Sequence, residues 1–277
     1  MRELKDKVAV ITGGGSGIGR SVALELASKG MHVVVADLDP GAAQLVADEV
    51  TALGVKGLPV TVDVGDRVSV EALAVAAYNE FGAVHVLHNN AGFALLLLLE
   101  NTTDADWDLI MRVNLLGVVN GIQAFLPRMQ AQDGEKHIVC TASMSGIVAF
   151  PTLGAYTATK YAVVGICETL RQEAAKDDIG VSVLCPGPVV TNIGVNSDKQ
   201  RPNAFGDAML VGAGRDPVEG AAGGMRYLDP ADVGRLVRMA IEENELYIFT
   251  HSELGPAARM RFDEIAKGYE RLAERIS

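Results

Sequence analysis

Cysteine is scarce in this 277-residue sequence, and its three copies are too few and too odd in number for a disulfide framework. We expect Cys140, Cys167 and Cys185 to be small buried thiols in a reducing cytosol. Long apolar runs are also missing: the longest near the middle, residues 93–99, is far below the roughly 20 residues of a membrane span. The N-terminus has neither the apolar stretch nor the cleavage site of a signal peptide. These absences predict a soluble, cytoplasmic protein.

Basic residues are outnumbered, because 24 Lys and Arg stand against 35 Asp and Glu and leave a formal net charge of −11. An acidic surface repels phosphate backbones and anionic lipids, so neither nucleic acid nor a membrane surface is an expected partner. Hydrophobic residues (49%) and charged residues (21%) exclude an intrinsically disordered chain and allow a large core.

Strand-like and helix-like segments alternate along the chain, and this alternation implies right-handed βαβ crossovers in one open parallel sheet. With no linker and no internal repeat, we predict a single α/β, doubly wound Rossmann-type domain with a seven-stranded parallel sheet over residues 1–277. Short runs rich in Val and Ile predict strands at 8–12, 32–36, 57–62, 84–88, 137–141, 181–185 and 246–250. Longer periodic stretches predict helices at 20–29, 40–53, 68–81, 104–129, 156–176 and 229–242.

Two segments stand outside this alternation. Residues 192–228 carry seven glycines and two prolines, and so long a connection in a compact domain is typical of a functional lid, here over the substrate. Residues 251–277 form a tail with apolar residues spaced 4, 3 and 4 apart: Ile265, Tyr269, Leu272 and Ile276. That spacing predicts a helix with one apolar face, which must be buried on this subunit or on a neighbour.

A glycine-rich turn, Thr12-Gly13-Gly14-Gly15-Ser16-Gly17-Ile18-Gly19, joins the first predicted strand to the first predicted helix. Glycines let the backbone turn sharply and bring amide N–H groups against a pyrophosphate at the helix N-terminus. The spacing Gly-x-x-x-Gly-x-Gly differs from the Gly-x-Gly-x-x-Gly fingerprint, but the position between strand and helix is that of a dinucleotide-binding turn.

Asp37 ends the second predicted strand, where a carboxylate can accept hydrogen bonds from the adenosine ribose hydroxyls. The same carboxylate repels the 2′-phosphate of NADP. Leu38 follows it, and the glycine turn has no Arg or Lys before Gly17. The sequence therefore favours NAD as the cofactor, and an NADP-linked ketone reductase is the alternative.

Tyr156 and Lys160 lie four residues apart on a predicted helix and therefore share a face. Tyrosine normally has a pKa of about 10, and we expect the nearby ammonium and the positive ring of an oxidised nicotinamide to favour the phenolate. Ser143 follows a strand end, where its hydroxyl can hold a substrate oxygen. Asn114, on the long predicted helix, can link a proton relay to water.

Other chemistries fit the sequence less well. His85 and His88 lie on a predicted strand at an odd separation, which puts their rings on opposite faces, so no metal site is expected there. The Gly-x-Ser-x-Gly elbow of the α/β-hydrolases is missing. The apolar run at 95–99 indicates either loop packing or a wall for an apolar ligand.

Together these motifs resemble the short-chain dehydrogenase/reductase family, specifically its classical branch. The likeness covers residues 7–250 and rests on motifs in family order and spacing. They are Thr12-Gly13…Gly17-Ile18-Gly19, Asp63, Asn89-Asn90-Ala91-Gly92, Asn114, Ser143, Tyr156…Lys160 and Pro186-Gly187-Pro188-Val189-Val190-Thr191. The Gly-x-x-Gly-x-x-Gly turn of the extended branch is missing.

The resemblance assigns roles to these residues. It implies that Tyr156 is the general acid and base, that Lys160 binds the nicotinamide ribose and lowers the tyrosine pKa, and that Ser143 orients the substrate oxygen. Asn114 would carry a water relay. Ser143 is preferred to Ser145 because it lies 13 residues before Tyr156, as in the family. The implied cofactor-binding residues are Gly13, Ser16, Gly17, Ile18, Gly19, Asp37, Asp63, Val64, Asn90, Tyr156, Lys160, Val189 and Thr191.

The expected reaction is hydride transfer between NAD and a secondary alcohol or ketone. The second half of the chain also resembles bacterial Cα-dehydrogenases that oxidise benzylic alcohols of lignin-type aryl ethers, which implies a bulky apolar or aromatic substrate. This likeness lies in residues 184–188, Asn196-Ser197…Arg201-Pro202 and residues 246–251. An NAD-sensing protein without catalysis is a further alternative, which the complete catalytic set disfavours. Family likeness also implies a homo-oligomer, a tetramer or a dimer, assembled through helices 104–129 and 156–176.

Overall fold

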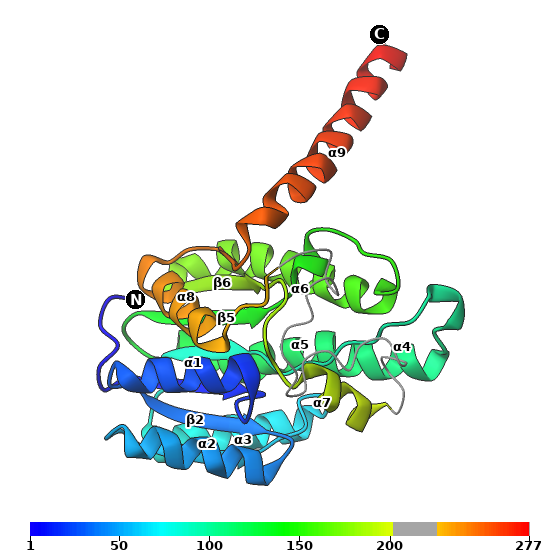
Figure 1. Ribbon diagram of the computed structural model, residues 1–277. Coiled ribbons are helices and arrows are strands. Elements are labelled where there is room, and N and C mark those ends of the chain that lie inside the picture. The colour runs from blue at the N-terminus through cyan, green and yellow to red at the C-terminus, as the bar shows by residue number, and fades with distance from the viewer. Residues whose placement is uncertain (202–225, 277) are drawn as a thin grey trace.

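The structure is a computed structural model that describes residues 1–201 and 226–276 (Figure 1). These residues form a seven-stranded parallel sheet in the order β3-β2-β1-β4-β5-β6-β7, which confirms the predicted doubly wound α/β fold. The strands are β1 Val8–Thr12, β2 His32–Asp37, β3 Gly57–Thr61, β4 Val86–Asn89, β5 Lys136–Thr141, β6 Ile179–Cys185 and β7 Tyr247–Phe249.

Strand β1 illustrates why these segments form a parallel sheet. All of its residues are buried, which is the pattern of a strand covered by helices on both faces. Alternate side chains enter different cores, because Val8 and Val10 belong to one hydrophobic cluster whereas Ala9 and Ile11 belong to the other. The sheet therefore separates two hydrophobic cores.

Each core is closed by a layer of helices, and the predicted helices are confirmed with bounds that differ by a few residues. The first layer consists of α1 Gly17–Ser28, α2 Pro40–Ala52 and α8 Pro230–Glu243. The second layer consists of α3 Arg67–Phe81, α5 Gly117–Gln130 and α6 Gly154–Ala174.

The helix predicted over residues 104–129 is not α-helical throughout. It consists of α4 Asp104–Ile110, a π-helical turn Met111–Leu116 and then α5. The wide turn carries the buried Asn114, whose side-chain amide bonds to both backbone groups of Phe93. Because this contact joins distant parts of the chain, local periodicity does not register it, and π-helical turns of this kind often occur at functional sites.

Among the described residues, one helical stretch, Asp104–Gln130, is long and apolar enough to cross a membrane by length and composition. In this fold one face of the stretch packs into the core, and 39% of its apolar window is buried. Ile110, Phe125 and Met129 are fully buried, and α5 packs against α3 and β4.

The order of the strands places a crevice between β1 and β4. The chain winds outward from β1 to β2 and β3, then crosses to β4 and continues to β7 in the other direction. At such a switch point the loops after the two central strands separate, and ligands bind at the carboxyl ends of the strands. The glycine turn follows β1 and Asn90-Ala91-Gly92 follows β4, so both predicted motifs lie at this crevice.

The tail forms helix α9, Gly255–Ile276, which rises away from the body of the domain (Figure 1). Its base is held by the buried Leu254 and by the Arg261 guanidinium, which lies 4.9 Å from the centroid of the Tyr161 ring. The four predicted apolar residues are between 45% and 77% exposed. The predicted helix is confirmed, but its apolar face is not buried on this subunit, so burial on a neighbour stays a prediction.

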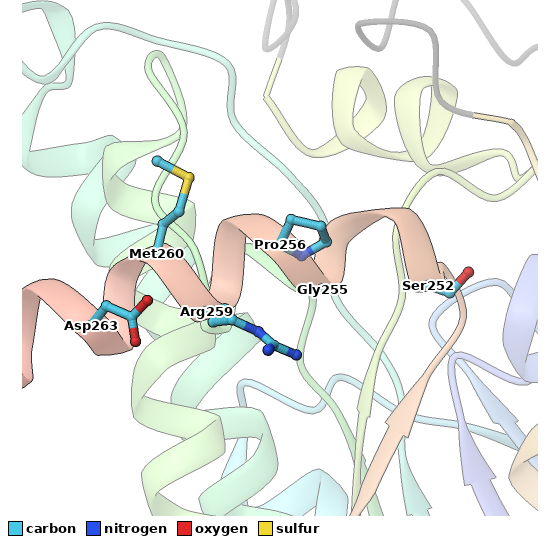
Figure 2. A pocket seen from close by; sticks show the side chains of 6 residues that line it. All are labelled: Ser252, Gly255, Pro256, Arg259, Met260 and Asp263. Carbon is cyan, nitrogen blue, oxygen red and sulfur yellow. The ribbon is translucent and has the colours of Figure 1, made fainter.

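A shallow pocket of about 410 Å³ lies at the base of α9 (Figure 2). Its lining residues all come from one short stretch of chain, and Figure 2 shows Met260 and Arg259 on different sides of the helix. Because the described residues that line this pocket all lie within residues 252–263, the crevice at the switch point, which several distant segments form, is the better candidate for a functional site.

The predicted lid, residues 192–228, is described only in part. Helix α7, Ile193–Gln200, belongs to it, and Leu228 at its end pairs with Val189 in an isolated β-bridge. The other predicted lid residues, 202–225, lie outside the described residues, and the lid itself stays a prediction.

Candidate active site

The glycine turn has a backbone that only glycine adopts without strain at two positions. Gly13 and Gly17 have φ values of 63° and 51°. A Cβ atom on Gly13 would lie 2.9 Å from the Ala91 Cα, and one on Gly19 would lie 2.1 Å from the Gly13 carbonyl oxygen. Helix α1 begins at Gly17 without a side-chain cap, so the N–H groups of its first turn are available to an anion.

Asn90 ties the glycine turn to the centre of the sheet. Its side-chain nitrogen donates to the Thr12 and Gly13 carbonyls at 3.1 and 3.3 Å, and its side-chain oxygen accepts from the Thr141 hydroxyl at 3.1 Å. The Thr12 hydroxyl oxygen in turn accepts from the backbone N–H groups of Asn90 and Ala91. Asn90 was predicted to flank the adenosine ribose, and these bonds show that it also positions the turn.

Asp37 lies beside the glycine turn, at the carboxyl end of β2. One carboxylate oxygen accepts from the Gly15 N–H at 2.9 Å, and the other accepts from the Asp39 N–H at 3.0 Å. Arg20, the first basic residue after the turn, is held by a two-point ion pair with Glu49, with an N–O distance of 2.7 Å. The local charge at this end of the crevice is therefore negative.

Asp63 is paired with a basic residue that the sequence motifs did not single out. The Arg112 Nη1 atom lies 3.0 Å from one Asp63 oxygen, and the Gly65 N–H donates to the other at 2.8 Å. Asn120 donates to the carbonyl of Val64, which fixes the loop after β3. Arg112 lies in the π-helical turn, so its contact with Asp63 depends on a turn that the sequence patterns do not predict.

These elements enclose a cleft of about 650 Å³ at the switch point, within the range of ligand-binding cavities. Its lining comes from the glycine turn, the segments after the strands, α6 and α7. The predicted site residues that line it are Gly13, Ser16, Gly17, Ile18, Asp37, Asp63, Val64, Asn90, Tyr156, Lys160 and Thr191.

Four predicted residues do not line the cleft: Gly19, Asn114, Ser143 and Val189. Gly19 fits under the carbonyl of Gly13, and Val189 packs against the hydrophobic cluster that contains β1 residues. Asn114 is fully buried and holds Phe93 through both of its side-chain polar atoms, at 3.0 and 2.8 Å. Its side chain positions the loop after β4, and the water relay stays a prediction.

Tyr156 and Lys160 share one face of α6, as predicted, and both line the cleft. The buried Lys160 ammonium donates to the Thr141 carbonyl at 2.8 Å and lies 5.5 Å from the centroid of the Tyr156 ring. Gly92 lies close by, because a Cβ atom there would be 3.6 Å from the ammonium nitrogen and 3.1 Å from the Asn114 side-chain oxygen. The Thr141 carbonyl at the end of β5 thus holds the Lys160 ammonium beside the Tyr156 phenol.

Burial has the larger effect on both of these groups. It raises the pKa of Tyr156 to about 12, and the hydrogen bond with Ser143 opposes this rise only in part. It also lowers the pKa of Lys160 to about 8. In the chain on its own, the desolvation of a phenolate outweighs its stabilisation by neighbouring groups. The predicted lowering of the tyrosine pKa includes the effect of an oxidised nicotinamide and stays a prediction.

Ser143 and Ser145 have different surroundings. Ser143 forms the hydrogen bond with Tyr156, and its side-chain oxygen accepts from the Ser145 N–H at 3.1 Å. Ser145 is 4% exposed and lies inside a short helical turn, Met144–Gly146. The geometry agrees with the preference for Ser143.

An apolar cluster borders the tyrosine. Phe93, Ala94, Leu95, Ile110 and Ala155 form it, and Tyr156 packs against it. We call the first three, Phe93-Ala94-Leu95, the apolar wall. It overlaps the start of the run at 95–99, whereas Leu98 and Leu99 are 48% and 62% exposed.

No group of three side chains that could hold a metal ion occurs among the described residues. His88 lies on β4 and bonds through its Nε2 atom to the Thr141 hydroxyl at 2.9 Å. His85 lies just before β4, one correction to the predicted strand, and its Nδ1 atom accepts from the Val8 N–H at 3.2 Å. Each histidine has a partner within the fold.

The family model for short chain dehydrogenases matches residues 7–202. The chain belongs to the short-chain dehydrogenase family. This dehydrogenase is 32% identical over 266 residues to the C alpha-dehydrogenase of Sphingobium sp. strain SYK-6, in an alignment that covers 96% of this chain and 87% of the relative.

Solved structures resemble the dehydrogenase over nearly its whole length. A short chain dehydrogenase/reductase from Burkholderia phymatum, in complex with NAD, has a TM-score of 0.86 and 37% identity over 97% of each chain. The apo form of LigO from Sphingobium sp. strain SYK-6 has a TM-score of 0.81 and 35% identity, and covers 99% of this chain and 92% of LigO. The predicted resemblance to the short-chain dehydrogenases and to Cα-dehydrogenases is confirmed.

Several residues that line the dehydrogenase cleft were not predicted from the sequence. Thr141 and Arg112 contact predicted residues, as described above. A further group comes from α7 and the residue before it: Asn192, Ile193, Asn196, Lys199 and Gln200. Two signals pointed to α7: the prediction of a substrate lid over residues 192–228, and the likeness of the Asn196-Ser197 pair to Cα-dehydrogenases. Its position over the cleft depends on contacts between residues far apart in the sequence.

Proposed function

We propose that this dehydrogenase transfers a hydride between NAD and a secondary alcohol or ketone, with a bulky apolar or aromatic substrate. The observation that carries the proposal is a single cleft that is lined by Tyr156 and Lys160 as well as by the glycine turn and Asp37, with Ser143 next to Tyr156. The bound nicotinamide supplies the acceptor or donor of the hydride.

The residues present fit a dinucleotide. The turn has no room for side chains at Gly13 and Gly19, and the uncapped start of α1 offers N–H groups to a pyrophosphate. We assign the adenosine ribose to Asp37, the adenine to Asp63 and Val64, and the carboxamide to Val189 and Thr191. Asn90 and Lys160 would border the two riboses.

Tyr156 is the proposed acid and base. In alcohol oxidation its phenolate oxygen takes the hydroxyl proton of the substrate, and in ketone reduction its phenol returns that proton. Ser143, which shares a hydrogen bond with Tyr156, orients the same substrate oxygen. Lys160, held by the Thr141 carbonyl, adds a positive charge beside the developing phenolate and binds the nicotinamide ribose.

The substrate class follows from the apolar wall beside Tyr156 and from the C alpha-dehydrogenase relative. The test is a panel of aryl, alicyclic and short aliphatic secondary alcohols with NAD, followed by NADH absorbance. We expect the highest kcat/KM for aryl alcohols. If the protein bound NADH but oxidised no alcohol on the panel, the non-catalytic NAD-sensing alternative would replace this proposal.

Asp37→Asn is expected to weaken NAD binding by about tenfold or more and to improve NADP binding. A hydrogen bond to a charged group contributes roughly 1.5–3 kcal/mol, and about 1.4 kcal/mol corresponds to tenfold in affinity. Asn keeps an oxygen that can accept from the Gly15 N–H, so the turn is preserved. Fluorescence titrations with NADH and NADPH measure the change, and tighter binding of NADPH than NADH by the wild type would support the NADP-linked alternative.

Alcohol oxidation is expected to speed up from about pH 6 to about pH 8, because above its pKa of about 8 Lys160 loses the charge that supports the phenolate. Since burial raises the pKa of Tyr156 to about 12 in the chain on its own, the phenolate fraction grows about tenfold per pH unit below that value. Ketone reduction, which needs the phenol, should not fall over the same range. Initial rates with a deuterated alcohol show whether hydride transfer limits the rate; under that condition, a flat oxidation profile would contradict the assignment.

We also propose that the dehydrogenase is a cytoplasmic homo-oligomer, a tetramer or a dimer. The three buried free cysteines agree with a reducing compartment. The exposed apolar face of α9 agrees with association of subunits. Light scattering coupled to size-exclusion chromatography tests the assembly, and a monomer at micromolar concentration would contradict it.

A further inference from the structure

Three polar side chains attach helix α7 and the residue after it to the rest of the domain. All three belong to the segment whose sequence resembles Cα-dehydrogenases. Asn196, Ser197 and Arg201 each bond to a different part of the fold. The residues of the helix that line the cleft include Asn196 itself and Ile193, which is 39% exposed. These attachments therefore determine how close α7 lies to the substrate side of the cleft.

The strongest attachment is the ion pair between Arg201 and Asp106 of α4. The Arg201 Nε atom lies 2.7 Å from one carboxylate oxygen, and its Nη2 atom lies 3.3 Å from the other. The Asp106 side chain is 5% exposed, and Arg201 holds its pKa at about 2. Asp106 also accepts from the Thr103 N–H and hydroxyl, so its carboxylate is fixed before Arg201 reaches it.

Ser197 makes the second attachment. It is fully buried, and its hydroxyl oxygen accepts from the Ala94 N–H at 3.0 Å. Ala94 is part of the apolar wall, which belongs to the same cluster as Ile110 of α4 and Tyr156 of α6. The end of α7 near Ser197 and Arg201 is therefore joined both to the apolar wall and to helix α4. We call it the substrate end of α7.

The third attachment lies at the cofactor side. The Asn196 side-chain nitrogen donates to the Ser16 hydroxyl of the glycine turn at 3.4 Å. This bond is longer than the other two and connects neutral groups. Loss of the Arg201–Asp106 pair should therefore affect the substrate end more than the cofactor end.

We propose that Arg201 and Asp106 are positioning residues for the substrate: their ion pair, together with the Ser197–Ala94 bond, holds α7 against the apolar wall and sets the space for a bulky apolar group beside Tyr156. The inference rests on the proposed function. It assigns to the Asn196-Ser197…Arg201 motif a role in substrate selection that is separate from hydride transfer itself.

Steady-state kinetics on Arg201→Gln test the proposal. We expect the KM for a bulky aryl alcohol to rise about tenfold or more, with kcat, the KM for a small aliphatic alcohol and the Kd for NADH within about twofold of wild type. Asp106→Asn should have the same effect. Because both variants remove the same ion pair, the double variant should lose less than the sum of the two single losses. Arg201→Lys, which keeps the charge, should restore part of the loss.

Arg238→Gln is the matched control. Arg238 forms ion pairs with Glu25 and Glu242 between α1 and α8, is 18% exposed in its side chain and does not line the cleft. This variant should leave the KM for the aryl alcohol unchanged. An equal rise in that KM in Arg238→Gln, or additive effects of the Asp106 and Arg201 changes, would overturn the proposal.

Hydrogen–deuterium exchange supplies a readout without substrate. In Arg201→Gln, the amides of residues 193–201 and the Ala94 N–H should exchange faster than in wild type, whereas Arg238→Gln should leave them unchanged. Unchanged exchange in Arg201→Gln would overturn the proposal. If the wild type oxidised no alcohol, the proposed function would fail by itself, and exchange would still decide whether the ion pair holds α7.

Discussion

Tyr156→Phe is expected to lower kcat for alcohol oxidation by at least about a thousandfold and to leave the Kd for NADH within about twofold of wild type. General acid–base catalysis by a positioned group contributes about 10²–10⁴ in rate, and phenylalanine keeps the ring but removes the proton acceptor. The ring packs against the apolar wall, so the cleft should keep its shape. Stopped-flow rates and NADH fluorescence titrations measure the two quantities.

Tyr161→Phe is the control on the same helix. Its hydroxyl donates to the Ile147 carbonyl at 2.8 Å, and Tyr161 does not line the cleft, so this variant tests the loss of a buried phenol hydroxyl on α6 without loss of the proposed base. It should retain nearly the wild-type kcat. Near-normal turnover by Tyr156→Phe, with Tyr161→Phe also normal, would mean that another group moves the proton.

Lys160→Met is expected to damage both catalysis and cofactor binding, with kcat lower by at least about a hundredfold and the Kd for NADH higher by about tenfold or more. The methionine side chain fills the buried space but supplies no charge beside the phenol and no donor to the Thr141 carbonyl or to a ribose. The dependence of kcat on pH should also change. Burial lowers the pKa of Lys160 to about 8, so the wild type loses this charge as the pH rises through that value, and the variant has no such step.

The control for the lysine is Lys176→Met. Lys176 lies in the turn that follows α6 and is exposed, so its replacement removes one positive charge from the same segment but not from the cleft. Activity and NADH affinity should remain at wild-type values. If Lys160→Met bound NADH as tightly as wild type, the proposed binding of the nicotinamide ribose by Lys160 would be contradicted, and only its role in catalysis would remain.

Much of the fold could be predicted because it depends on local patterns. The strands of a parallel sheet are apolar runs between turns, and β1 was found at its observed bounds, Val8–Thr12. Asp37 at the end of β2, and Tyr156 and Lys160 one helical turn apart, were placed by the same periodicities. Element type and the position of a residue within an element therefore gave the outline of the cleft.

What could not be predicted depends on distant contacts and on burial. Arg112 approaches Asp63 across 49 residues, and Arg201 approaches Asp106 across 95. The pKa of Tyr156 lies above, not below, its ordinary value because desolvation acts in the folded cleft, and a spacing of four residues contains no information about it. The exposed face of α9 has the expected periodicity, but periodicity does not say what covers it.

The π-helical turn Met111–Leu116 has a consequence for protein engineering. It contains one residue more than an α-helical turn, and each residue of an α-helix corresponds to a rotation of about 100°. Deleting a single residue from this turn would therefore not merely shorten a helix. It would rotate α4 about its axis, move Ile110 out of the apolar cluster beside Tyr156 and separate Asp106 from Arg201. We therefore expect insertions and deletions to be least tolerated in this π-helical turn.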